Sequence, residues 1–598
     1  MQAVILAAGR GRRLRPITDT IPKALVEVNG KSFLVNELDA FSKYKDIKEV
    51  IIVVGYKKDL IKKNIGKTYK GMKIIYVDND DWETTNNIYS FWLAINKIKE
   101  DFILSESDLI FEHDLLNVLI ENRNKNMVLL SEYNSLMSGT VVELNKDMSI
   151  KRLITSDEQG DDFNYKNKYK TINIYSFNYE FFREHLKPSL KIYIRNHKQD
   201  YWELIIGVLV YLKTPNIYGH ISKEKWFEVD DEIDLDIANY IFSSNDEKIK
   251  MISSSHGGLW RYNLIDFCFL TNPYFPTKRF YDDLLISVPK LIQNYPSSQN
   301  KICRLLSRWY KEDSFNEGNL LVGNGASELI RIINRNFVKM ITIPVPTFNE
   351  YEDIKSHNKN YFLLNENEKF KIDVDDFILS VKKSKSNFAL IINPNNPTGV
   401  QTPKQDIIKI IDNLQNLDGI IIDESFIQFT TGDMRNSIQP LVKEYDNLIV
   451  VRSIGKEYGC LGLRLGYLLT SNCKLREKIN NYIPIWNINS ISEKFIELVP
   501  RYEKDFKGSL QKIINDRTKM FNQLKKYHFL KIFQTSANFF LVKISDEIDS
   551  KYFCEKLFSE GIYVKNCSNK TLLNDKFIRI SIRDEKDNNK LIDALGRI

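Results

Sequence analysis

The chain's 598 residues exceed what one hydrophobic core organises, so two or three domains are expected. Hydrophobic residues make up 43% and charged residues 27%, which is typical of globular proteins and predicts no long disordered region. The net charge of +7 is small and the basic residues are dispersed, which argues against nucleic-acid binding but allows local basic pockets for phosphorylated substrates.

The cysteines and the apolar segments indicate the cellular compartment in which the protein is expected. The six cysteines include no CxxC pair, so neither a zinc site nor a disulfide framework is indicated, and a reducing cytoplasm fits. No run of about 18 apolar residues occurs, which predicts no membrane span. The opening MQAVILAAG is a short apolar run followed by arginines, the reverse of a signal peptide's charge order. We therefore expect a cytoplasmic protein without membrane or nucleic-acid partners.

The first half alternates β-rich and helical segments. Strands are expected at 3–6, 50–54, 73–77, 102–104 and 127–130, and helices at 33–44 and 87–98. This alternation predicts a doubly wound α/β sheet, a Rossmann-like domain over residues 1–245. The polar, serine-rich stretch SSNDEKIKMISSS follows, and it predicts a linker at 246–255.

Residues 256–598 form the second expected domain. Buried runs at 389–392, 419–422 and 448–451 alternate with helices, and the pattern becomes α+β from about residue 536. A large α/β subdomain followed by a smaller α+β subdomain is therefore expected. No internal repeat links the two halves.

A glycine-rich loop follows the first expected strand. In LAAGRGRRLRPITDTIPKAL, residues 6–25, glycines let the backbone approach a ligand while arginines and a lysine supply charge suited to a triphosphate. The spacing LAAGxGxR followed by PK and leucine resembles the sugar-phosphate and choline-phosphate nucleotidyltransferases. This resemblance implies that Lys23 holds the α-phosphate and the attacking group, and that Arg13 stabilises departing pyrophosphate. The implied nucleotide-binding residues are Leu6, Ala7, Ala8, Gly9, Arg10 and Gly11.

The same resemblance implies two magnesium-binding aspartates. Mg²⁺ neutralises the phosphates while an oxygen nucleophile attacks the α-phosphorus. Asp108 lies in FILSESDLIF, directly after an apolar run, where its carboxylate would emerge at the carboxyl edge of the sheet. Asp230 lies in WFEVDDEIDLDIA, which is similar to the family's second aspartate motif. Asp231 and Asp234 are the alternatives for this second role.

The segment DNDDWETTNNIYSFWLA, residues 78–94, bears on the acceptor. Its NNIYS resembles the choline-phosphate cytidylyltransferase subgroup, which implies CTP and a small aminated phosphate or phosphonate. A quaternary ammonium favours an aromatic box, whereas a primary amine gains more from charge-assisted hydrogen bonds, and both residue kinds are present. The expected acceptor-binding residues are Asn87, Tyr89, Tyr175, Trp202 and Glu203. Further candidates are Trp82, Trp92, Tyr201, Asp81, Glu106 and Asp200.

Four segments of the second half resemble fold type I pyridoxal-phosphate (PLP) enzymes, especially the branch of histidinol-phosphate aminotransferase and threonine-phosphate decarboxylase. They are GNGASELI (323–330), PVPTFNEY (344–351), NPNNPTG (393–399) with IIIDESF (420–426), and RSIGKEYGCLGLRLGY (452–467). The first opens a helix whose N-terminus favours the cofactor's phosphate. The implied cofactor contacts are Gly325, Ala326, Ser327, Phe348, Asn396, Asp423, Ser453, Lys456 and Arg464.

The resemblance also implies separate roles within this set. Phe348 stacks on the cofactor ring, and Asn396 hydrogen-bonds its 3′-oxygen. Asp423 keeps the ring nitrogen protonated, so that the ring acts as an electron sink. Lys456 is the lysine that bonds to the cofactor, and Arg464 is a phosphate ligand.

Two departures from the family pattern are informative. Gly455 replaces the usual serine before the lysine, so one phosphate contact is lost or is supplied by Ser453. Phe426 replaces the usual tyrosine after the aspartate and is also seen in the decarboxylase branch, which weakens a plain histidinol-phosphate assignment. Near the end, FIRISIR is similar to the segment whose arginine binds an acidic substrate group. This implies that role for Arg579, with Arg583 as a second cation.

The two halves together resemble fusions of a 2-aminoethylphosphonate cytidylyltransferase with a transaminase. This implies transamination of phosphonoacetaldehyde to 2-aminoethylphosphonate and coupling of that amine to CTP, giving CMP-2-aminoethylphosphonate and pyrophosphate. The alternative is a phosphocholine or phosphoethanolamine cytidylyltransferase fused to a PLP-dependent phospho-amino-acid decarboxylase, which Phe426 leaves open. Fold type I enzymes usually complete their sites across a dimer, so a homodimer through the second domain is expected.

Overall fold

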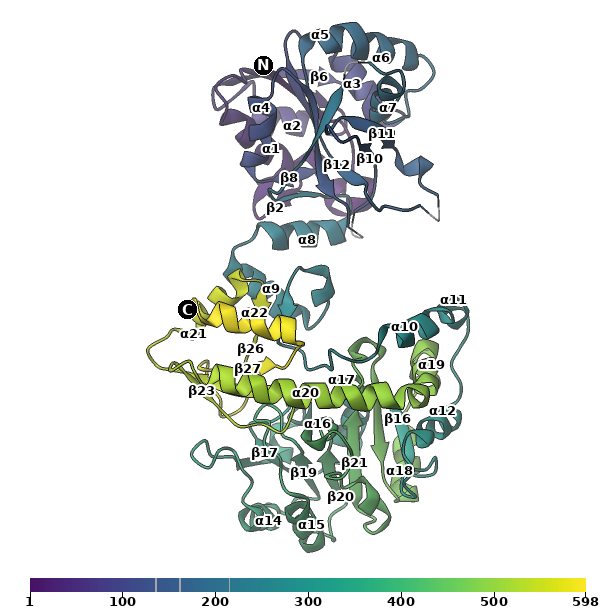
Figure 1. Cartoon of the computed structure of the whole chain (residues 1–598), viewed down its shortest axis with the longest axis vertical. Coiled ribbons are helices and arrows are strands. Elements are labelled where there is room, and N and C mark those ends of the chain that lie inside the picture. Colours follow the sequence, from purple (N-terminus) through teal and green to yellow (C-terminus); the bar gives the residue numbers. More distant parts are fainter. Residues whose placement is uncertain (135–136, 161–162, 215) are drawn as a thin grey trace. The chain divides into compact units, whose positions relative to one another are not determined.

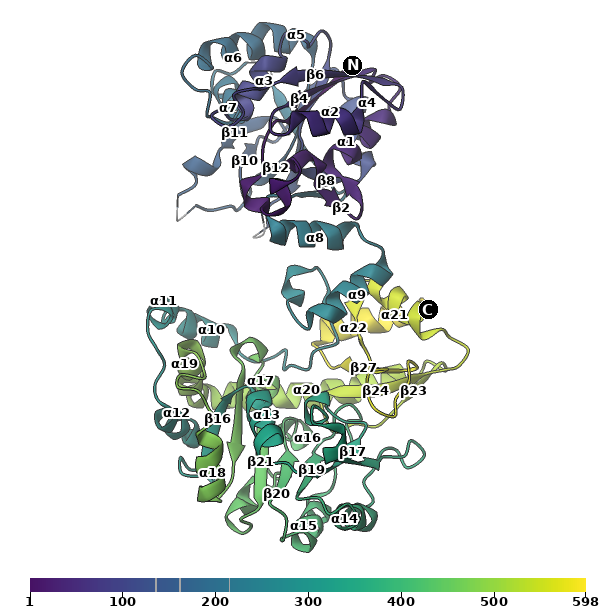
Figure 2. The same cartoon turned by 180° about the vertical axis from the view of Figure 1, so that it is seen from behind.

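The computed structural model describes residues 1–134, 137–160, 163–214 and 216–598. The chain divides into two compact units, Met1–Gly257 and Gly258–Ile598, which Figures 1 and 2 show from opposite sides. The segment expected to be a linker is instead helix α9 (Asn245–Ser255), which begins with a capping box between Ser244 and Glu247. Its polar composition is therefore that of a capped helix start rather than of an irregular connection.

The first unit is built on a ten-stranded sheet with the order β11-β10-β12-β7-β1-β4-β6-β5, in which β9 pairs with β12 and β13. Strands β7, β1, β4 and β6 are parallel, and β12 continues the sheet antiparallel to β7. The bounds are β1 (Gln2–Ala7), β4 (Glu49–Val54), β5 (Thr68–Tyr69), β6 (Met72–Asp78), β7 (Phe102–Glu106), β9 (Asn126–Glu132), β10 (Val141–Leu144), β11 (Ile150–Ile154), β12 (Tyr169–Phe177) and β13 (Ile217–Ile221).

Helices cover both faces of this sheet, and strand β1 is accordingly apolar from Ala3 to Ala7. Val4 packs in one core cluster with Phe91 of α3 (Asn87–Ala94), whereas Ile5 packs in another with Leu38 of α1 (Phe33–Ser42). Successive side chains of a strand point to opposite faces, so a strand covered on both faces is apolar at every position. The doubly wound sheet expected from the sequence is confirmed.

A small antiparallel pair adjoins the main sheet of the first unit. Strand β8 (Leu109–Phe111) pairs with β14 (Trp226–Glu228), with Leu109 opposite Glu228. Helix α8 (Glu232–Phe242) begins shortly after β14. This pairing joins the segment that follows β7 to a segment more than a hundred residues later, and it therefore determines which acidic residues meet.

The second unit contains a seven-stranded sheet with the order β16-β22-β21-β20-β19-β17-β18. Strands β17 to β21 run parallel, and β22 is antiparallel to both of its neighbours. The carboxyl ends of the parallel strands therefore lie at one edge. The bounds are β16 (Leu320–Asn324), β17 (Ile341–Val345), β18 (Lys359–Leu363), β19 (Phe388–Ile392), β20 (Gly419–Asp423), β21 (Leu448–Ser453) and β22 (Leu465–Leu469).

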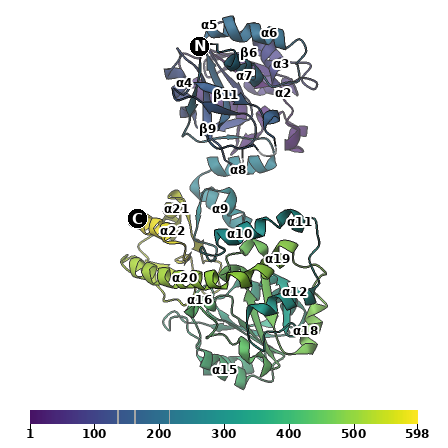
Figure 3. The same cartoon turned by 45° about the vertical axis from the view of Figure 1, so that its right-hand side comes forward.

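The end of the chain forms a smaller α+β subdomain, as expected. Its antiparallel sheet has the order β23-β24-β27-β26, and helix α20 contacts both α16 of the large subdomain and α22 of the small one (Figure 3). No helix among the described residues is long and apolar enough to cross a membrane. The bounds are α16 (Gln428–Thr431), α20 (Glu503–Leu524), β23 (Leu530–Ile532), β24 (Phe539–Ile544), β26 (Lys565–Asn566), β27 (Phe577–Ser581) and α22 (Glu585–Leu595).

Two candidate active sites

Lys23 lies between the two predicted metal-binding aspartates of the first unit. Its ammonium is 2.8 Å from Asp108 Oδ2 and 3.0 Å from Asp230 Oδ1, and Arg13 Nη2 is 2.9 Å from the same Asp230 oxygen. Burial disfavours the charged form of Lys23, but the two carboxylates outweigh burial and raise its pKa. Burial alone would raise the pKa of Asp230, and the charges of Lys23 and Arg13 lower it instead. The charged forms are thus mutually stabilised.

Local backbone structure brings these residues together. Gly11 has a φ of 72°, a conformation that glycine adopts without strain, and it begins the short helix Arg12–Leu14. A Cβ atom at Gly11 would lie 3.0 Å from Lys23 Cβ, so the loop and the lysine are in close contact. On the acidic side, the N–H of Val229 donates to the carbonyl of Asp108 at 3.0 Å, which holds the segments of the two aspartates next to each other.

The alternative aspartates are engaged in the N-terminal cap of α8. The Asp231 side chain accepts hydrogen bonds from the N–H groups of Ile233 and Asp234. Asp234 Oδ2 accepts from the N–H of Asp230 at 3.0 Å. Asp231 therefore accepts from the first turn of α8, whereas Asp234 accepts from the N–H groups that precede the helix. Both side chains hold the backbone beside Asp230, and neither forms an ion pair with Lys23 among the described residues.

Glu228 joins the two aspartates, although the sequence analysis did not single it out. One carboxylate oxygen each of Asp108, Glu228 and Asp230 lie within 4.8 Å of one another, and Asp108 Oδ1 is buried without a hydrogen-bond partner. Such an oxygen set, with an acceptor left free, fits Mg²⁺. The sequence contains a signal for Glu228, because residues two apart at the end of a strand point to the same face, and Glu228 and Asp230 are two residues apart.

The predicted acceptor residues, Tyr89 excepted, gather in a buried cluster. Asn87 Nδ2 donates to Glu106 Oε1 at 2.7 Å, and Asn87 Oδ1 accepts from the N–H of Trp202 at 2.9 Å. Glu203 accepts a hydrogen bond from the Tyr175 hydroxyl. The rings of Tyr175 and Trp202 are fully buried and meet edge to face, 4.6 Å apart. These aromatic side chains therefore belong to the core as well as to the candidate site.

Tyr89 and Arg10 take other partners. The Tyr89 hydroxyl donates to Asp81 Oδ2 at 3.3 Å, and Arg10 Nη2 lies 3.0 Å from Asp19 Oδ1. Neither side chain is hydrogen-bonded to the Lys23 cluster among the described residues. By contrast, a Cβ atom at Gly9 would meet nothing within 4 Å, so the loop leaves open space beside its backbone. This opening suits the approach of a nucleotide to the backbone.

The carboxylates beside Lys23 outnumber the cations near them. Burial, followed by the charges of Asp108, Glu203 and Glu228, raises the pKa of Glu106 well above its ordinary value. Burial also raises the pKa of Glu228, although the Lys170 ammonium is 3.1 Å from Glu228 Oε2. Buried carboxylates without enough counter-charge favour a cationic ligand that donates hydrogen bonds.

In the second unit, Lys456 lies between two phenyl rings. It belongs to the short helix α17 (Ile454–Glu457) after β21, and its Nζ is 4.4 Å from the ring centroid of Phe426 and 5.5 Å from that of Phe348. Burial lowers the pKa of Lys456 to about 8, although Asp423 acts in the opposite direction. A substantial fraction of Lys456 is therefore a neutral amine at moderately alkaline pH, where an unperturbed lysine is almost fully charged.

Asp423 is fixed at the end of β20 by two hydrogen bonds. Its Oδ2 accepts from the Tyr351 hydroxyl at 2.9 Å, and its Oδ1 accepts from the N–H of Ser425 at 2.9 Å. Tyr351 was not predicted, although it lies in PVPTFNEY together with Phe348. The position of Asp423, buried at the carboxyl edge of the sheet, fits the partner of a pyridinium nitrogen.

The predicted phosphate ligands meet at the start of α13 (Ala326–Asn336). Arg464 Nη2 lies 3.1 Å from Ser327 Oγ, and the Arg464 carbonyl accepts from the N–H of Gly325 at 2.6 Å. Gly325 has a φ of 75°, a conformation that glycine adopts without strain, and a Cβ atom there would lie 2.7 Å from Arg464 Nη2. A guanidinium beside a helix N-terminus favours a phosphate, and the residues present therefore fit PLP.

The two departures from the family pattern have structural counterparts. A Cβ atom at Gly455 would lie 3.2 Å from Leu461 Cα, so the backbone leaves little room for the usual serine. The N–H of Ser453 donates to Ser425 Oγ at 2.8 Å, which ties this turn to the segment after Asp423. Phe426 presents an apolar ring to Lys456 where the family pattern has a phenol.

Arg579 lies in β27 and faces the predicted cofactor residues. Its Nη1 donates to Asn396 Oδ1 at 2.6 Å and its Nη2 to the Cys268 carbonyl at 2.7 Å, while its Nε is buried without a partner. Arg583 behaves differently, because its Nη2 lies 3.4 Å from Asp587 Oδ2 of α22. The two arginines are therefore not equivalent, and Arg579 alone contacts a predicted cofactor residue among the described residues.

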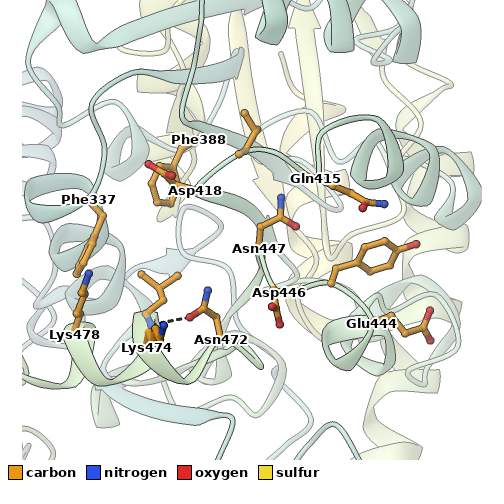
Figure 4. A pocket seen from close by; sticks show the side chains of 13 residues that line it. Phe337, Phe388, Gln415, Asp418, Glu444, Asp446, Asn447, Asn472, Lys474 and Lys478 are labelled. Carbon is orange, nitrogen blue, oxygen red and sulfur yellow. Dashed lines mark hydrogen bonds between the residues drawn. The ribbon is translucent and has the colours of Figure 1, made fainter.

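A hollow of about 650 Å³ lies at the opposite, amino edge of the second sheet. Figure 4 shows its lining, in which Phe388, Asp418 and Asn447 come from the segments that enter β19, β20 and β21. Ligands of open α/β sheets bind at the carboxyl ends of the strands. None of the sequence-predicted site residues lines this hollow, so it does not belong to the candidate site.

Similar proteins divide the chain in the same way. The model of the family Nucleotidyl transferase matches residues 2–200, and that of Aminotransferase class I and II matches residues 291–595. CMP-5′-(3-aminopropyl)phosphonate synthase of Streptomyces rubellomurinus is 30% identical over 603 residues, which cover 100% of this chain and 95% of that protein.

Two further relatives match the second unit. L-serine phosphate decarboxylase of Campylobacter jejuni is 32% identical over 347 residues, covering 55% of this chain and 87% of that protein. The crystal structure of histidinol-phosphate aminotransferase from Clostridium acetobutylicum superposes with a TM-score of 0.50 at 29% identity, covering 56% of this chain and 98% of that chain. The fold class expected from the sequence is confirmed.

Capture of PLP by the cofactor-free protein should become faster as the pH rises. Only the neutral amine of Lys456 attacks an aldehyde, and a pKa of about 8 means that its neutral fraction grows from about pH 7 to about pH 9 and then levels off. Stopped-flow absorbance of the bound cofactor measures this rate, and Lys456→Ala should show no capture. A rate that does not change over this range would contradict the assignment.

Proposed function

Since the chain belongs to the aminotransferase class I and II family and carries a nucleotidyltransferase domain before it, we propose that it is a bifunctional enzyme that makes a CMP-activated aminophosphonate. The first unit transfers CMP from CTP to 2-aminoethylphosphonate and releases pyrophosphate. The second unit supplies this amine by PLP-dependent transamination of phosphonoacetaldehyde. Similarity along the whole chain to a CMP-5′-(3-aminopropyl)phosphonate synthase supports a phosphonate acceptor.

In the proposed cytidylyl transfer, the positive charges of the first unit act on the phosphates. Lys23 lies between the acidic set and the glycine-rich loop, where its ammonium neutralises charge on the α-phosphate and on the attacking oxygen. Arg13 is placed to stabilise pyrophosphate as it leaves. Asp108, Glu228 and Asp230 would hold Mg²⁺, which adds positive charge against the phosphates.

The observation that carries the choice of acceptor is the excess of buried carboxylates beside Lys23. Glu106 and Glu203 offer oxygens to an ammonium that donates hydrogen bonds, whereas Tyr175 and Trp202 turn their rings to each other. A primary amine uses such carboxylates, while a quaternary ammonium needs exposed aromatic faces. This arrangement supports 2-aminoethylphosphonate over phosphocholine.

Phosphorus NMR of the protein with Mg²⁺, CTP and, in parallel, 2-aminoethylphosphonate, phosphocholine or phosphoethanolamine should show conversion of the phosphonate alone into a mixed phosphonate-phosphate anhydride. Glu106→Gln should lower kcat/KM for the phosphonate about 30-fold or more, because it removes a buried partner of the ammonium. The matched control is Glu121→Gln, which changes an exposed side chain of the same unit. Preference for a phosphate ester would reject the phosphonate acceptor.

In the proposed second reaction, PLP supplies the electron sink that stabilises negative charge at the amino carbon. Lys456 moves the proton at that carbon, since its amine is neutral at moderately alkaline pH. Asp423, held by Tyr351, stabilises positive charge at the ring nitrogen. Phe348 and Phe426 exclude water from the lysine, and Arg579 binds an anionic group of the amino substrate.

Decarboxylation is the second candidate for this unit. The similarity to L-serine phosphate decarboxylase favours it, as does Phe426, which the decarboxylase branch shares. The same lysine, aspartate and arginine serve either reaction, because both begin from negative charge developed beside the cofactor ring. The product is again a small amine with a phosphate or phosphonate group, so the first unit receives the same class of acceptor.

The two routes differ in their need for an amino donor. With PLP bound, the protein should convert phosphonoacetaldehyde to 2-aminoethylphosphonate only when an amino donor such as glutamate is present, as followed by phosphorus NMR. The competing outcome is release of labelled CO₂, without any donor, from carboxyl-labelled L-serine phosphate or 2-amino-3-phosphonopropionate. That result would reject transamination in favour of decarboxylation. Lys456→Ala should abolish either reaction, which excludes contaminating enzymes.

An exposed apolar face of the second unit supports the expected homodimer. The rings of Tyr295 and Trp486 stack 4.2 Å apart at the surface, close to the helices α10 (Lys278–Leu285) and α11 (Val288–Ile292). Several large apolar side chains exposed in the same part of a unit are typical of an interface. The exposed side chains of this face are Leu285, Ile286, Ile292, Tyr295, Ile485 and Trp486. In the proposal a second copy of the chain covers them.

Light scattering should therefore give twice the chain mass of 70.1 kDa. The double change Ile286→Asp with Ile485→Asp should give monomers, because both side chains, 80% and 76% exposed, would place charge in the interface. Ile192→Asp provides the matched control, since that isoleucine is 73% exposed on the first unit. A wild-type monomer, or a double variant that remains dimeric, would contradict this interface.

A further inference from the structure

A second buried amine lies beside the cofactor residues. Lys570 is in the loop between β26 and β27 and is only 7% exposed. Its Nζ lies 5.7 Å from the ring centroid of Phe348, the ring that Lys456 also approaches. No role was assigned to Lys570 by the sequence motifs, and the two reactions considered so far do not use it.

The contacts of Lys570 leave its charge without a counter-ion. Its Nζ donates to the Thr347 carbonyl at 2.9 Å and to Asn349 Oδ1 at 2.5 Å, both on the loop that carries Phe348. Among the described residues no carboxylate lies within 4.0 Å of this ammonium. The acid nearest to this loop, Glu352, accepts from the Thr571 hydroxyl instead. One N–H of the ammonium thus remains for a ligand.

Arg579 shows the same lack of a counter-ion. It is 8% exposed, and among the described residues it donates only to the neutral oxygens of Asn396 and Cys268 and keeps a buried Nε without a partner. After burial, the charge of Arg579 is the largest influence that lowers the pKa of Lys570, to about 7, so without an anion the Lys570 amine is charged only in part at neutral pH. An anion bound between the two side chains would raise that pKa and keep both of them charged.

We propose that Lys570 and Arg579 form a two-cation subsite that binds the phosphonate or phosphate group of the amino substrate and makes this unit specific for substrates with such a group. The subsite is distinct from the cofactor-phosphate cup of Ser327 and Arg464 at the start of α13. Lys570 acts as a specificity-determining residue, because a carboxylate carries one negative charge where a phosphonate carries up to two. The inference rests on the proposed function only in assuming an aminated substrate of this class, and it holds for transamination and decarboxylation alike.

Binding of an anion without an amino group tests this subsite apart from catalysis. Ethylphosphonate and propionate are titrated calorimetrically into the PLP-loaded full-length protein. Lys570→Met removes the charge and its hydrogen bonds, while Lys570→Gln removes the charge but keeps a donor for the Thr347 carbonyl. Lys590→Met, at an exposed position of α22, is the charge-matched control. Cofactor absorbance and the thermal midpoint verify that each variant is folded and loaded.

Both Lys570 variants should bind ethylphosphonate at least about 10-fold more weakly than the wild type, whereas the control should not change. Propionate should bind weakly to all four proteins. Wild-type affinity for ethylphosphonate in Lys570→Gln would show that Lys570 only connects its own loop to the loop that carries Phe348. Unchanged affinity in both Lys570 variants would overturn the subsite. If ethylphosphonate binding depends on Lys570 but the protein neither transfers amino groups nor releases CO₂, the subsite is supported and the proposed reaction is rejected.

Discussion

The structure depends on how burial and charge are balanced at two lysines. Lys23 lies between Asp108 and Asp230, so its ammonium stays charged despite burial. Removing Lys23 would leave Asp108 without an ion-pair partner among the described residues, at a cost of several kcal/mol. Lys456 lies between phenyl rings without an ion-pair partner among the described residues, so burial lowers its pKa. On the proposed assignment, one lysine is thereby kept as a cation for phosphates and the other as a nucleophile.

Both balances are produced by strand topology. In the first unit, the pairing of β8 with β14 holds Asp108 next to Asp230, and the cap of α8 fixes the backbone of Asp230. In the second unit, the ends of parallel strands deliver Asp423 and Lys456 to the same edge. Side chains that are distant in sequence thus meet because their strands are paired or adjacent. Each unit carries its own candidate site. The two proposed reactions share a small amine as product and substrate.

Much of this was predictable from the sequence, because apolar strands and glycine turns leave strong local patterns. The strands and both motif sets follow from such patterns. The Ser244–Glu247 capping box of α9 is equally visible in the sequence, although a linker was expected at 246–255. Tyr351 and Lys570 are single residues that contact distant segments, which no local pattern records, whereas Glu228 shares a strand face with Asp230 and was open to inference. An aromatic residue such as Trp202 gives the same sequence pattern in a hydrophobic core and in a binding site, so only the structure shows that its side chain is buried.

The surplus of carboxylates around Glu106 has a thermodynamic consequence. Burial and neighbouring carboxylates raise its pKa well above the ordinary value, so ionising this side chain costs free energy while no acceptor is bound. On the proposed assignment an incoming ammonium stabilises the ionised carboxylate and lowers that pKa. Acceptor binding is then linked to the ionisation of Glu106, and any proton that is released contributes a heat that depends on the buffer.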